Sequence, residues 1–276
     1  MITVHEVKEY WHHHPLLSFE LKDLGSKEFF DDLDRIKRED VEKFALRYWK
    51  FDEFKGEKVL DVGCGPGWIT VNYALHGAIV FSVDLTQKAV ELTKKHLQYK
   101  HIPAIVQEGN AEDLPFEDNS FDLVVASGVL HHTPNTLKAM EECFRVLKCG
   151  GSAKITLYHK GILHHKVVFP IVKSLLRLSK IKHPGSKLAD AKGVDDFIRQ
   201  YDGSANPIGI GKTTLEWRRL LKKAGFFIKR HELHFFPKRF IPFLKITPVP
   251  LHYLLDRFFG MMVYFDLGKR TLNSSP

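Results

Sequence analysis

Short apolar runs recur along the middle of the chain and alternate with stretches whose apolar residues have helical spacing. Glycine or polar residues flank each run, and this pattern favours buried strands of a parallel sheet. The predicted strands are residues 58–62, 78–84, 104–108, 121–127, 152–159, 226–236 and 260–269. The predicted helices between them are residues 68–76, 86–99, 135–147 and 213–224. We therefore expect a doubly wound α/β sheet, whose ligands lie beyond the carboxyl ends of the strands.

The N-terminal segment, residues 1–55, departs from this alternation and is predicted to be helical. Val4, Val7 and Trp11 fall at helical spacing, and a second helical stretch covers about residues 27–48. This segment contributes no predicted strand, so we expect it to cover the sheet.

Tyr10 and Trp11 are followed by three adjacent histidines, His12, His13 and His14. Adjacent residues point apart on a helix and no carboxylate follows at ligand spacing, so we expect no metal site there. The preferred hypothesis is a lid whose aromatic side chains cover a pocket. Its candidate substrate contacts are Tyr10, Trp11 and His14, and plain packing against the sheet is the alternative.

Two later segments interrupt the alternation and are predicted to be lid-like insertions. Residues 160–212 begin with a helix that Pro170 should kink or delimit. Its apolar stripe comprises Leu163, Val167, Ile171, Leu175 and Leu178, and its basic face Lys166, Lys173, Arg177 and Lys180. Residues 237–259 mix aromatic residues with lysine and arginine, which can lie in a bilayer interface or cap the core. The expected organisation is a helical lid at 1–55 and one α/β domain at 56–276 that contains both insertions.

A glycine-rich turn follows the first predicted strand, in the sequence Val59-Leu60-Asp61-Val62-Gly63-Cys64-Gly65-Pro66-Gly67-Trp68. Backbone can approach a ligand closely at such a turn before a helix. The dinucleotide fingerprint G-x-G-x-x-G would need a third glycine where the chain has Trp68. The phosphate loop G-x-x-x-x-G-K-[ST] also fails, because no Lys-Ser or Lys-Thr follows the turn. Both phosphate-binding hypotheses are therefore disfavoured.

Two acidic residues frame this turn. Asp61 precedes the first glycine, and Asp84 ends the second predicted strand. The Asp84 carboxylate can accept hydrogen bonds from vicinal ribose hydroxyls, each worth about 1.5–3 kcal/mol. Asp61 instead favours a cationic group such as an ammonium or a sulfonium. A ligand with a ribose and a positive charge but no phosphate is S-adenosylmethionine.

Residues 56–160 resemble the class I S-adenosylmethionine-dependent methyltransferases, particularly the small-molecule group called type 11. The segments that carry the resemblance are residues 59–67, Val83-Asp84-Leu85, residues 109–116, Phe121-Asp122-Leu123-Val124 and residues 145–151. Asn110 stands where the family often has Asp, and Cys149 where it usually has Pro. The resemblance implies a seven-stranded sheet whose last strand, here residues 261–269, runs antiparallel.

The resemblance also implies which residues hold the cofactor. The glycine turn would approach the methionine part, Asp84 the ribose, and residues 110–112 the adenine. The expected cofactor contacts are Asp61, Gly63, Cys64, Gly65, Gly67, Asp84, Leu85, Asn110, Ala111, Glu112 and Ser127. S-adenosyl-L-homocysteine would be the product.

The sequence Ser127-Gly128-Val129-Leu130-His131-His132 follows the fourth predicted strand, at the edge where cofactor and acceptor must meet. Histidine suits general-base chemistry near neutral pH, so His132 is the candidate catalytic residue. Support of the loop is its alternative role, because a histidine is common here across the family whatever the acceptor. His131 and Tyr158 are candidate contacts of the acceptor.

Charge and cysteine content add two points to this picture. The net charge is +8, and residues 160–245 hold 19 Lys and Arg against 6 Asp and Glu. That excess suggests an anionic partner or a solvated basic face. Three cysteines without paired spacing indicate a cytoplasmic protein. We also expect no signal peptide and no membrane span.

The main hypothesis is O- or N-methylation, by in-line displacement, of a small and largely apolar or lipid-like acceptor. We expect residues 1–20, 160–212 and 237–259 to enclose that acceptor, with peripheral membrane or lipid contact. An RNA methyltransferase using the basic second half is the first alternative. No Asn-Pro-Pro-Tyr type motif follows the fourth strand and no Pro-Cys nucleophile occurs, so nucleic acid is disfavoured as a partner. The second alternative is a non-catalytic S-adenosylmethionine-binding module, against which the intact glycine turn argues.

Overall fold

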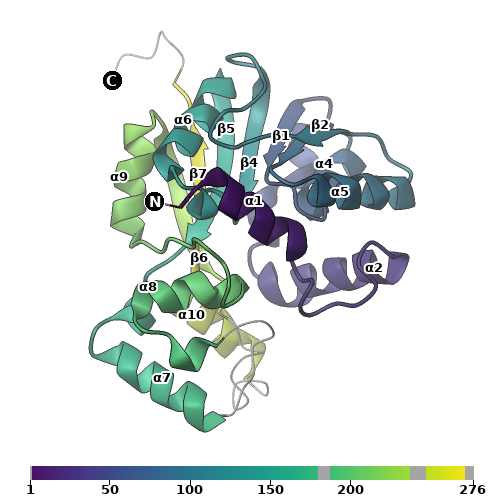
Figure 1. The fold of residues 1–276 in the computed structure, drawn as a ribbon. Helices are drawn as coiled ribbons and strands as arrows, with labels where there is room; N and C mark the ends of the chain where they lie inside the picture. The colour runs from purple at the N-terminus through teal and green to yellow at the C-terminus, as the bar shows by residue number, and fades with distance from the viewer. Residues whose placement is uncertain (1, 180–186, 237–246, 271–276) are drawn as a thin grey trace.

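The computed structural model describes residues 2–179, 187–236 and 247–270. Within them one seven-stranded sheet has the order β3-β2-β1-β4-β5-β7-β6 (Figure 1). Its strands are β1 (Lys58–Val62), β2 (Ile79–Asp84), β3 (Ile105–Glu108), β4 (Phe121–Ser127), β5 (Leu147–Tyr158), β6 (Phe227–His234) and β7 (Met262–Gly268). Neighbouring strands are parallel except that β7 runs antiparallel to both β5 and β6. The predicted α/β sheet with an antiparallel last strand is confirmed.

Four helices follow strands or precede them as predicted. They are α4 (Trp68–Leu75), α5 (Gln87–Lys100), α6 (Thr136–Val146) and α9 (Thr214–Lys223). Thr86, Asn135 and Thr213 are the N-caps of α5, α6 and α9. Each side chain accepts a hydrogen bond from the backbone N–H three residues on. Strand β5 begins at Leu147 rather than at residue 152, because a bulge lets the chain pair with β4 on both sides of the glycines.

The N-terminal segment is helical but more broken than predicted. It contains α1 (Val4–His13), α2 (Lys27–Ile36), a π-helical turn (Lys37–Val41), α3 (Leu46–Trp49) and a 3₁₀ turn (Phe51–Phe54). The break after α2 turns Glu42 inward, where it is 1% exposed. Its carboxylate accepts hydrogen bonds from Trp49 Nε1 and Tyr264 Oη, each at 3.1 Å. This buried carboxylate connects the N-terminal helices to β7.

The core has two layers, one on each face of the sheet. On one face Leu60 and Val62 pack with α6 and with Trp217 of α9. On the other face Val59 packs with the N-terminal helices and with Tyr73 of α4. Alternate residues of β1 therefore face opposite layers, as a strand buried on both sides requires.

A lobe lies beyond the carboxyl end of β5 and contains α7 (Val168–Ser179), α8 (Val194–Arg199) and α10 (Val249–Phe259) (Figure 1). Pro170 lies in the first turn of α7, so it delimits the helix rather than kinking it. Further 3₁₀ turns are Leu130–His132, Ile162–His164, Leu188–Asp190 and Gln200–Asp202. The predicted aromatic and basic segment at 237–246 lies outside the described residues. Within the described ranges, no helix is long and apolar enough to cross a membrane.

Replacement of Tyr48 by Phe tests the contact between the N-terminal helices and the sheet. Tyr48 Oη donates a buried hydrogen bond of 2.6 Å to the Phe265 carbonyl oxygen of β7. We expect Tyr48→Phe to lower the free energy of unfolding by about 1–3 kcal/mol, because a buried carbonyl loses its partner. Urea unfolding would measure the change, with the exposed Tyr253→Phe as control. Equal stability of the two variants would contradict this account.

Candidate active site

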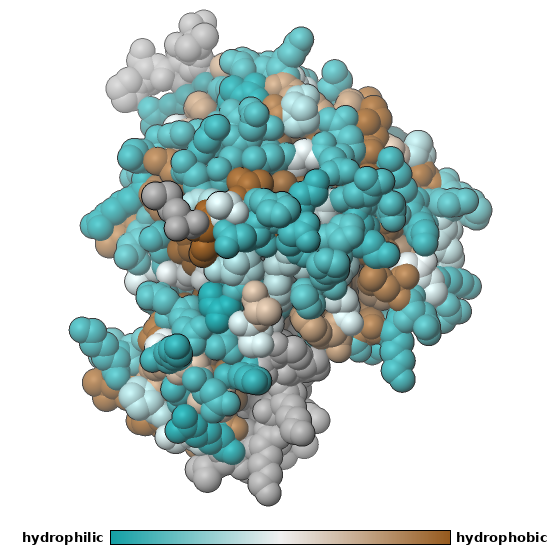
Figure 2. All heavy atoms as spheres, viewed as in Figure 1, coloured by the Kyte–Doolittle hydropathy of each residue, from teal (hydrophilic) through white to brown (hydrophobic). Residues whose placement is uncertain are grey.

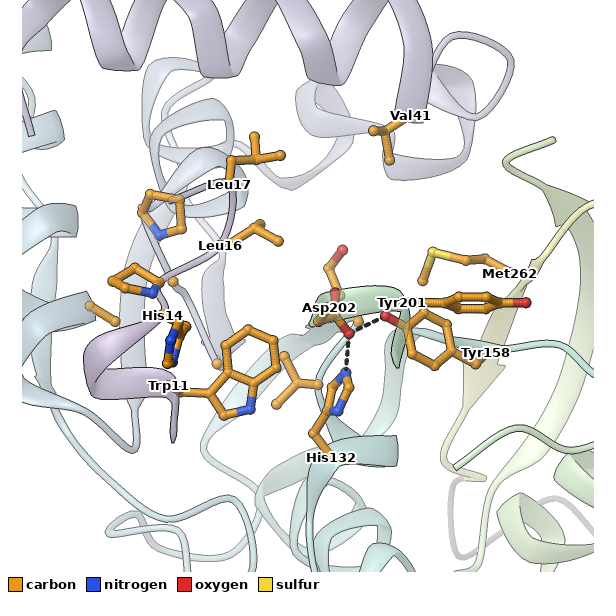
Figure 3. A pocket seen from close by; sticks show the side chains of 18 of the residues that line it. Trp11, His14, Leu16, Leu17, Val41, His132, Tyr158, Tyr201, Asp202 and Met262 are labelled. Atoms are coloured by element: carbon orange, nitrogen blue, oxygen red, sulfur yellow. Dashed lines mark hydrogen bonds and ion pairs between the residues drawn. The ribbon is translucent and has the colours of Figure 1, made fainter. Parts of the chain in front are cut away.

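A cavity of about 360 Å³ lies at the carboxyl ends of β1, β2, β4 and β5. Its size falls within the range of about 300–1,000 Å³ that is usual for ligand pockets. Segments far apart in the sequence form its walls: the end of α1 and the loop after it, the glycine turn, the β4 loop, the 160–212 insertion and the start of β7 (Figure 3). The site therefore requires the N-terminal segment as well as the sheet.

The glycine turn forms one end of the cavity. Gly63 has φ 73°, and a Cβ atom there would lie 2.3 Å from Cγ2 of Val129, so this position excludes any side chain. Gly65 has φ 53°, and a Cβ there would meet no atom within 4 Å. Its N–H donates a 3.0 Å hydrogen bond to Asp84 Oδ2. The turn thus exposes backbone to the cavity beside a carboxylate.

Asp84 is held in place by the backbone around it. Its Oδ1 accepts from the backbone N–H and the hydroxyl of Thr86 at 2.9 and 3.0 Å, and its Oδ2 accepts from Gly65. Burial raises the pKa of this carboxyl, and the bonds from Thr86 and Gly65 partly offset that effect. A carboxylate has about four acceptor positions, so one remains for a ligand hydroxyl. The arrangement fits a ribose.

Asp61 lies deeper, at 1% exposure, and still reaches the cavity wall. Its Oδ2 accepts a 2.7 Å hydrogen bond from the Thr70 hydroxyl. Burial raises the pKa of Asp61 to about 7, although the bonds from Thr70 oppose the shift. A cationic group in the cavity would favour the ionised carboxylate. The carboxylates of Asp84 and Asp61 together fit a ligand that carries hydroxyls and a positive charge.

The predicted cofactor contacts divide into those on the cavity wall and those behind it. On the wall lie Asp61, Gly63, Cys64, Gly65, Asp84, Leu85, Asn110, Ala111 and Ser127. Gly67 lies behind it, as the N-cap of α4 against Thr93. Glu112 also lies behind it, because its Oε1 accepts a 2.6 Å bond from the backbone N–H of Asn135. These two positions shape the turn and the start of α6.

The other end of the cavity holds a polar cluster around Asp202. His132 Nδ1 lies 2.7 Å from the Ile208 carbonyl oxygen, and its Nε2 lies 3.2 Å from Asp202 Oδ2. Tyr158 Oη donates a hydrogen bond to the same carboxylate oxygen. Figure 3 shows Asp202 between His132 and Tyr158, with Trp11 beside the imidazole. Both ring nitrogens of His132 therefore face oxygen acceptors.

His131 and Tyr10, both predicted to contact the acceptor, support the cluster from behind. His131 is fully buried against the Tyr158 ring, at 4.0 Å between centroids, and its ring nitrogens have no hydrogen-bond partner among the described residues. Burial lowers its pKa well below the usual range, so the ring is neutral. Tyr10 Oη donates a hydrogen bond to the backbone carbonyl of Asp202. Trp11, His14, His132 and Tyr158 line the cavity.

Several lining residues escaped the sequence reasoning, above all Asp202. The others include Val129. Figure 3 labels Leu16, Leu17, Val41, Tyr201 and Met262 among them. The polar sequence Tyr201-Asp202-Gly203 was visible in the insertion, but nothing local indicated that it faces His132.

The three adjacent histidines do not gather around a common point. His12 and His13 are exposed, and Nδ1 of His14 lies 3.0 Å from the Tyr10 carbonyl oxygen. In the part of the chain that the structure describes, no group of three potential metal ligands is found.

Comparison with known proteins agrees with this geometry. Residues 60–155 match the family model described as a methyltransferase domain. The chain carries a class I, S-adenosylmethionine-dependent methyltransferase domain. The match runs from β1 to β5 and includes the glycine turn, Asp84 and His132. The N-terminal helices and the lobe lie outside it.

Two curated relatives match about a third to a half of the chain. The ubiquinone biosynthesis O-methyltransferase of Coxiella burnetii (strain Dugway 5J108-111) is 33% identical over 97 residues, which are 35% of this chain and 42% of that protein. The malonyl-[acyl-carrier protein] O-methyltransferase of Erwinia billingiae is 31% identical over 132 residues, which are 48% of this chain and 49% of that protein. The chain thus spans about half the length of these relatives or less.

The fold extends further than the sequence match. A chain in the complex between the Haloferax volcanii Trm112 methyltransferase activator and the putative methyltransferase is similar, with a TM-score of 0.58. The similarity covers 90% of this chain and 97% of that one, at 15% identity. At this identity the likeness shows the shared fold.

Replacement of Asp84 tests the ribose site. We expect Asp84→Ala to weaken S-adenosylmethionine binding by about 10- to 150-fold, because a hydrogen bond to a charged group is lost. Isothermal titration calorimetry would measure the affinity, with the exposed Asp52→Ala as a matched control. Wild-type affinity in Asp84→Ala would refute the assignment.

Asp61 predicts a pH dependence of the same binding. Below about pH 7 the carboxyl is protonated in the free protein, so binding of a cationic ligand requires loss of that proton. We expect affinity to fall by up to about tenfold per pH unit below this pKa and to level off above it. Asp61→Asn should remove this part of the pH profile in calorimetry. Superimposable profiles of the two proteins would exclude the role of Asp61.

Proposed function

We propose that the protein transfers a methyl group from S-adenosylmethionine to an oxygen or nitrogen of a small, largely apolar acceptor. The observation that carries the proposal is one cavity that joins the glycine turn to the cluster around Asp202. Donor and acceptor groups would meet in this space, where proximity and alignment can supply roughly 7–11 kcal/mol of the barrier.

The cavity has polar binding groups at the end formed by the glycine turn and apolar side chains at the acceptor end. Asp84, Gly65 and Asp61 would hold the ribose and the cationic part of the cofactor. The bound cofactor would supply a methyl group carried on a sulfonium. Apolar side chains of Trp11, Leu16, Leu17, Val41 and Met262 line the acceptor end (Figure 3), where they would limit contact with water. Exclusion of water favours a transfer in which charge is neutralised.

His132 and Asp202 are placed to take the proton that the acceptor loses. The Ile208 carbonyl fixes the imidazole through Nδ1, so Nε2 and the Asp202 carboxylate face the cavity together. A proton leaving an acceptor hydroxyl or ammonium can pass to this pair. General-base help of this kind is worth about 10²- to 10⁴-fold. We assign the catalytic role to His132 and Asp202 acting together.

The cavity walls and the relatives support a small acceptor that is methylated on oxygen. Both curated relatives are named O-methyltransferases, which favours oxygen as the methylated atom. The 1–55 and 160–212 segments contribute apolar lining, so we propose that they act as acceptor lids. Because an apolar acceptor partitions into lipid, we include peripheral membrane contact in the proposal.

Asp202→Asn tests the proposed proton transfer. The purified protein would be incubated with methyl-tritiated S-adenosylmethionine and an organic extract of cellular small molecules, and label in the organic phase would be counted. We expect the labelling rate to fall about 10²- to 10⁴-fold while cofactor affinity stays unchanged, because the site loses its proton acceptor. His132→Ala should behave alike, and the exposed Asp195→Asn of the same insertion should not.

The same assay decides between the proposal and its rivals. Total RNA supplied as acceptor should take no label. Label in RNA, with a steep salt dependence, would support the RNA alternative that the basic second half suggests. Tight cofactor binding without label in either fraction would support a non-catalytic module. Either result would overturn the proposed function.

A further inference from the structure

Two helices of the lobe present apolar side chains to the solvent. On α7 and just before it, Val167, Ile171 and Leu175 are 69%, 58% and 60% exposed. On α10 the exposed apolar residues are Val249, Leu251, Tyr253, Leu254 and Phe258. We call these the outer stripes of α7 and α10. Figure 2 shows apolar residues among hydrophilic ones at the edge of this lobe, in the region of α7.

Helix α10 has the reverse of the usual amphipathic arrangement, because its polar residues face inward. Asp256 is 3% exposed, accepts a 2.9 Å bond from the Phe236 N–H and lies 2.7 Å from His234 Nδ1. His252 is also 3% exposed, with Nε2 3.1 Å from the Phe236 carbonyl oxygen. A helix that faces only water places such residues outside. In α10 these polar residues instead make contacts inside the protein, and the apolar residues lie outside.

Helix α7 is apolar on two faces. Phe169 is buried in the lobe, and Val172 and Leu176 line the cavity. The outer stripe, at Ile171 and Leu175, is exposed beside this buried face. Of the predicted apolar stripe, Leu163 lines the cavity, whereas Val167, Ile171 and Leu175 face the solvent. The apolar surface of α7 is therefore wider than the part that the lobe and the cavity bury.

Basic residues border the outer stripe of α7. Lys166 and Arg177 are exposed at its two ends, and Lys187 and Lys192 are exposed on the segment that follows. Apolar side chains beside lysine and arginine are the pattern of helices that lie in the interface of an anionic bilayer. The same excess of positive charge would repel a second copy of this chain.

We propose that the outer stripes of α7 and α10 dock the protein on the surface of an anionic lipid bilayer. The side chains of the stripes would enter the boundary between headgroups and acyl chains, and Lys166 and Arg177 would contact lipid phosphates. Val172 and Leu176 of α7 line the cavity. An apolar acceptor leaving the bilayer would therefore pass beside α7 to reach His132. This route rests on the proposed function, whereas the docking surface does not.

Vesicle flotation tests the surface without any knowledge of the acceptor. The full-length protein would be mixed with vesicles of phosphatidylcholine alone or with phosphatidylglycerol added. We expect binding to the anionic vesicles that weakens as salt rises from about 0.1 to 0.5 M, because surface charges are then screened. Ile171→Ser with Leu175→Ser, and separately Leu254→Ser with Phe258→Ser, should each lower the partition coefficient at least about tenfold.

Leu215→Ser is the matched control, because Leu215 is 57% exposed on α9, away from the stripes. It should bind vesicles like the wild type. Failure of the wild type to float at low salt, or equal binding by the stripe variants, would overturn the proposal. Concentration-dependent dimerisation that the stripe variants abolish would also overturn it, because a second copy would then be the occupant.

Cofactor affinity, measured on the same proteins, separates this proposal from the proposed function. The stripe variants should keep wild-type affinity for S-adenosylmethionine, which also shows that they are folded. Asp84→Ala should lose cofactor affinity and still float with anionic vesicles. Vesicle binding without any methyl transfer would leave the docking surface standing and remove the enzymatic proposal.

Discussion

The carboxylate of Asp202 is the interaction on which the acceptor end of the cavity depends. It faces His132 of the β4 loop and receives the hydroxyl of Tyr158 at the end of β5. Its backbone carbonyl receives the hydroxyl of Tyr10 from α1. One residue of the insertion therefore connects the sheet to the N-terminal helix. These bonds help to hold both α1 and the 160–212 insertion against the sheet at this end of the cavity.

The donor end is built on a different principle. There the strand, the turn and the helix are consecutive in the sequence, and the geometry follows from glycines that adopt positive φ. Val129 packs against Gly63, and Asp84 receives the N–H of Gly65, so β4 and β2 complete the turn from either side. The site is built from consecutive residues where it would hold the cofactor and from separate segments where it would hold the acceptor. A single domain type can accommodate different acceptors in this way.

The lobe contributes to the cavity wall and also carries exposed apolar residues that the cavity does not use. Its helices use polar residues as internal ties and present apolar residues outside, so burial alone does not account for their composition. Because α7 separates the cavity from this outer surface, the same helix serves both the pocket wall and the proposed lipid contact. The cavity and the outer surface thus share helix α7.

The amino-acid sequence alone determined the sheet, its strand boundaries apart from the start of β5, and most of the residues at the donor end of the cavity. These features depend on local patterns: apolar runs, capping residues such as Thr86 and Thr213, and glycines at fixed spacing from an acidic residue. The break after α2 escaped prediction, because it depends on Glu42 reaching Trp49 and Tyr264.

Only the tertiary structure decided the acceptor end and the orientation of the lobe helices. Asp202 meets His132 across a long stretch of sequence, and no local pattern records that contact. The spacing of Ile171 and Leu175 is the same whether the stripe faces a core or the solvent, so periodicity indicated a helix but not its environment. Periodicity reports the local backbone, whereas the neighbours of a face depend on how the whole chain packs.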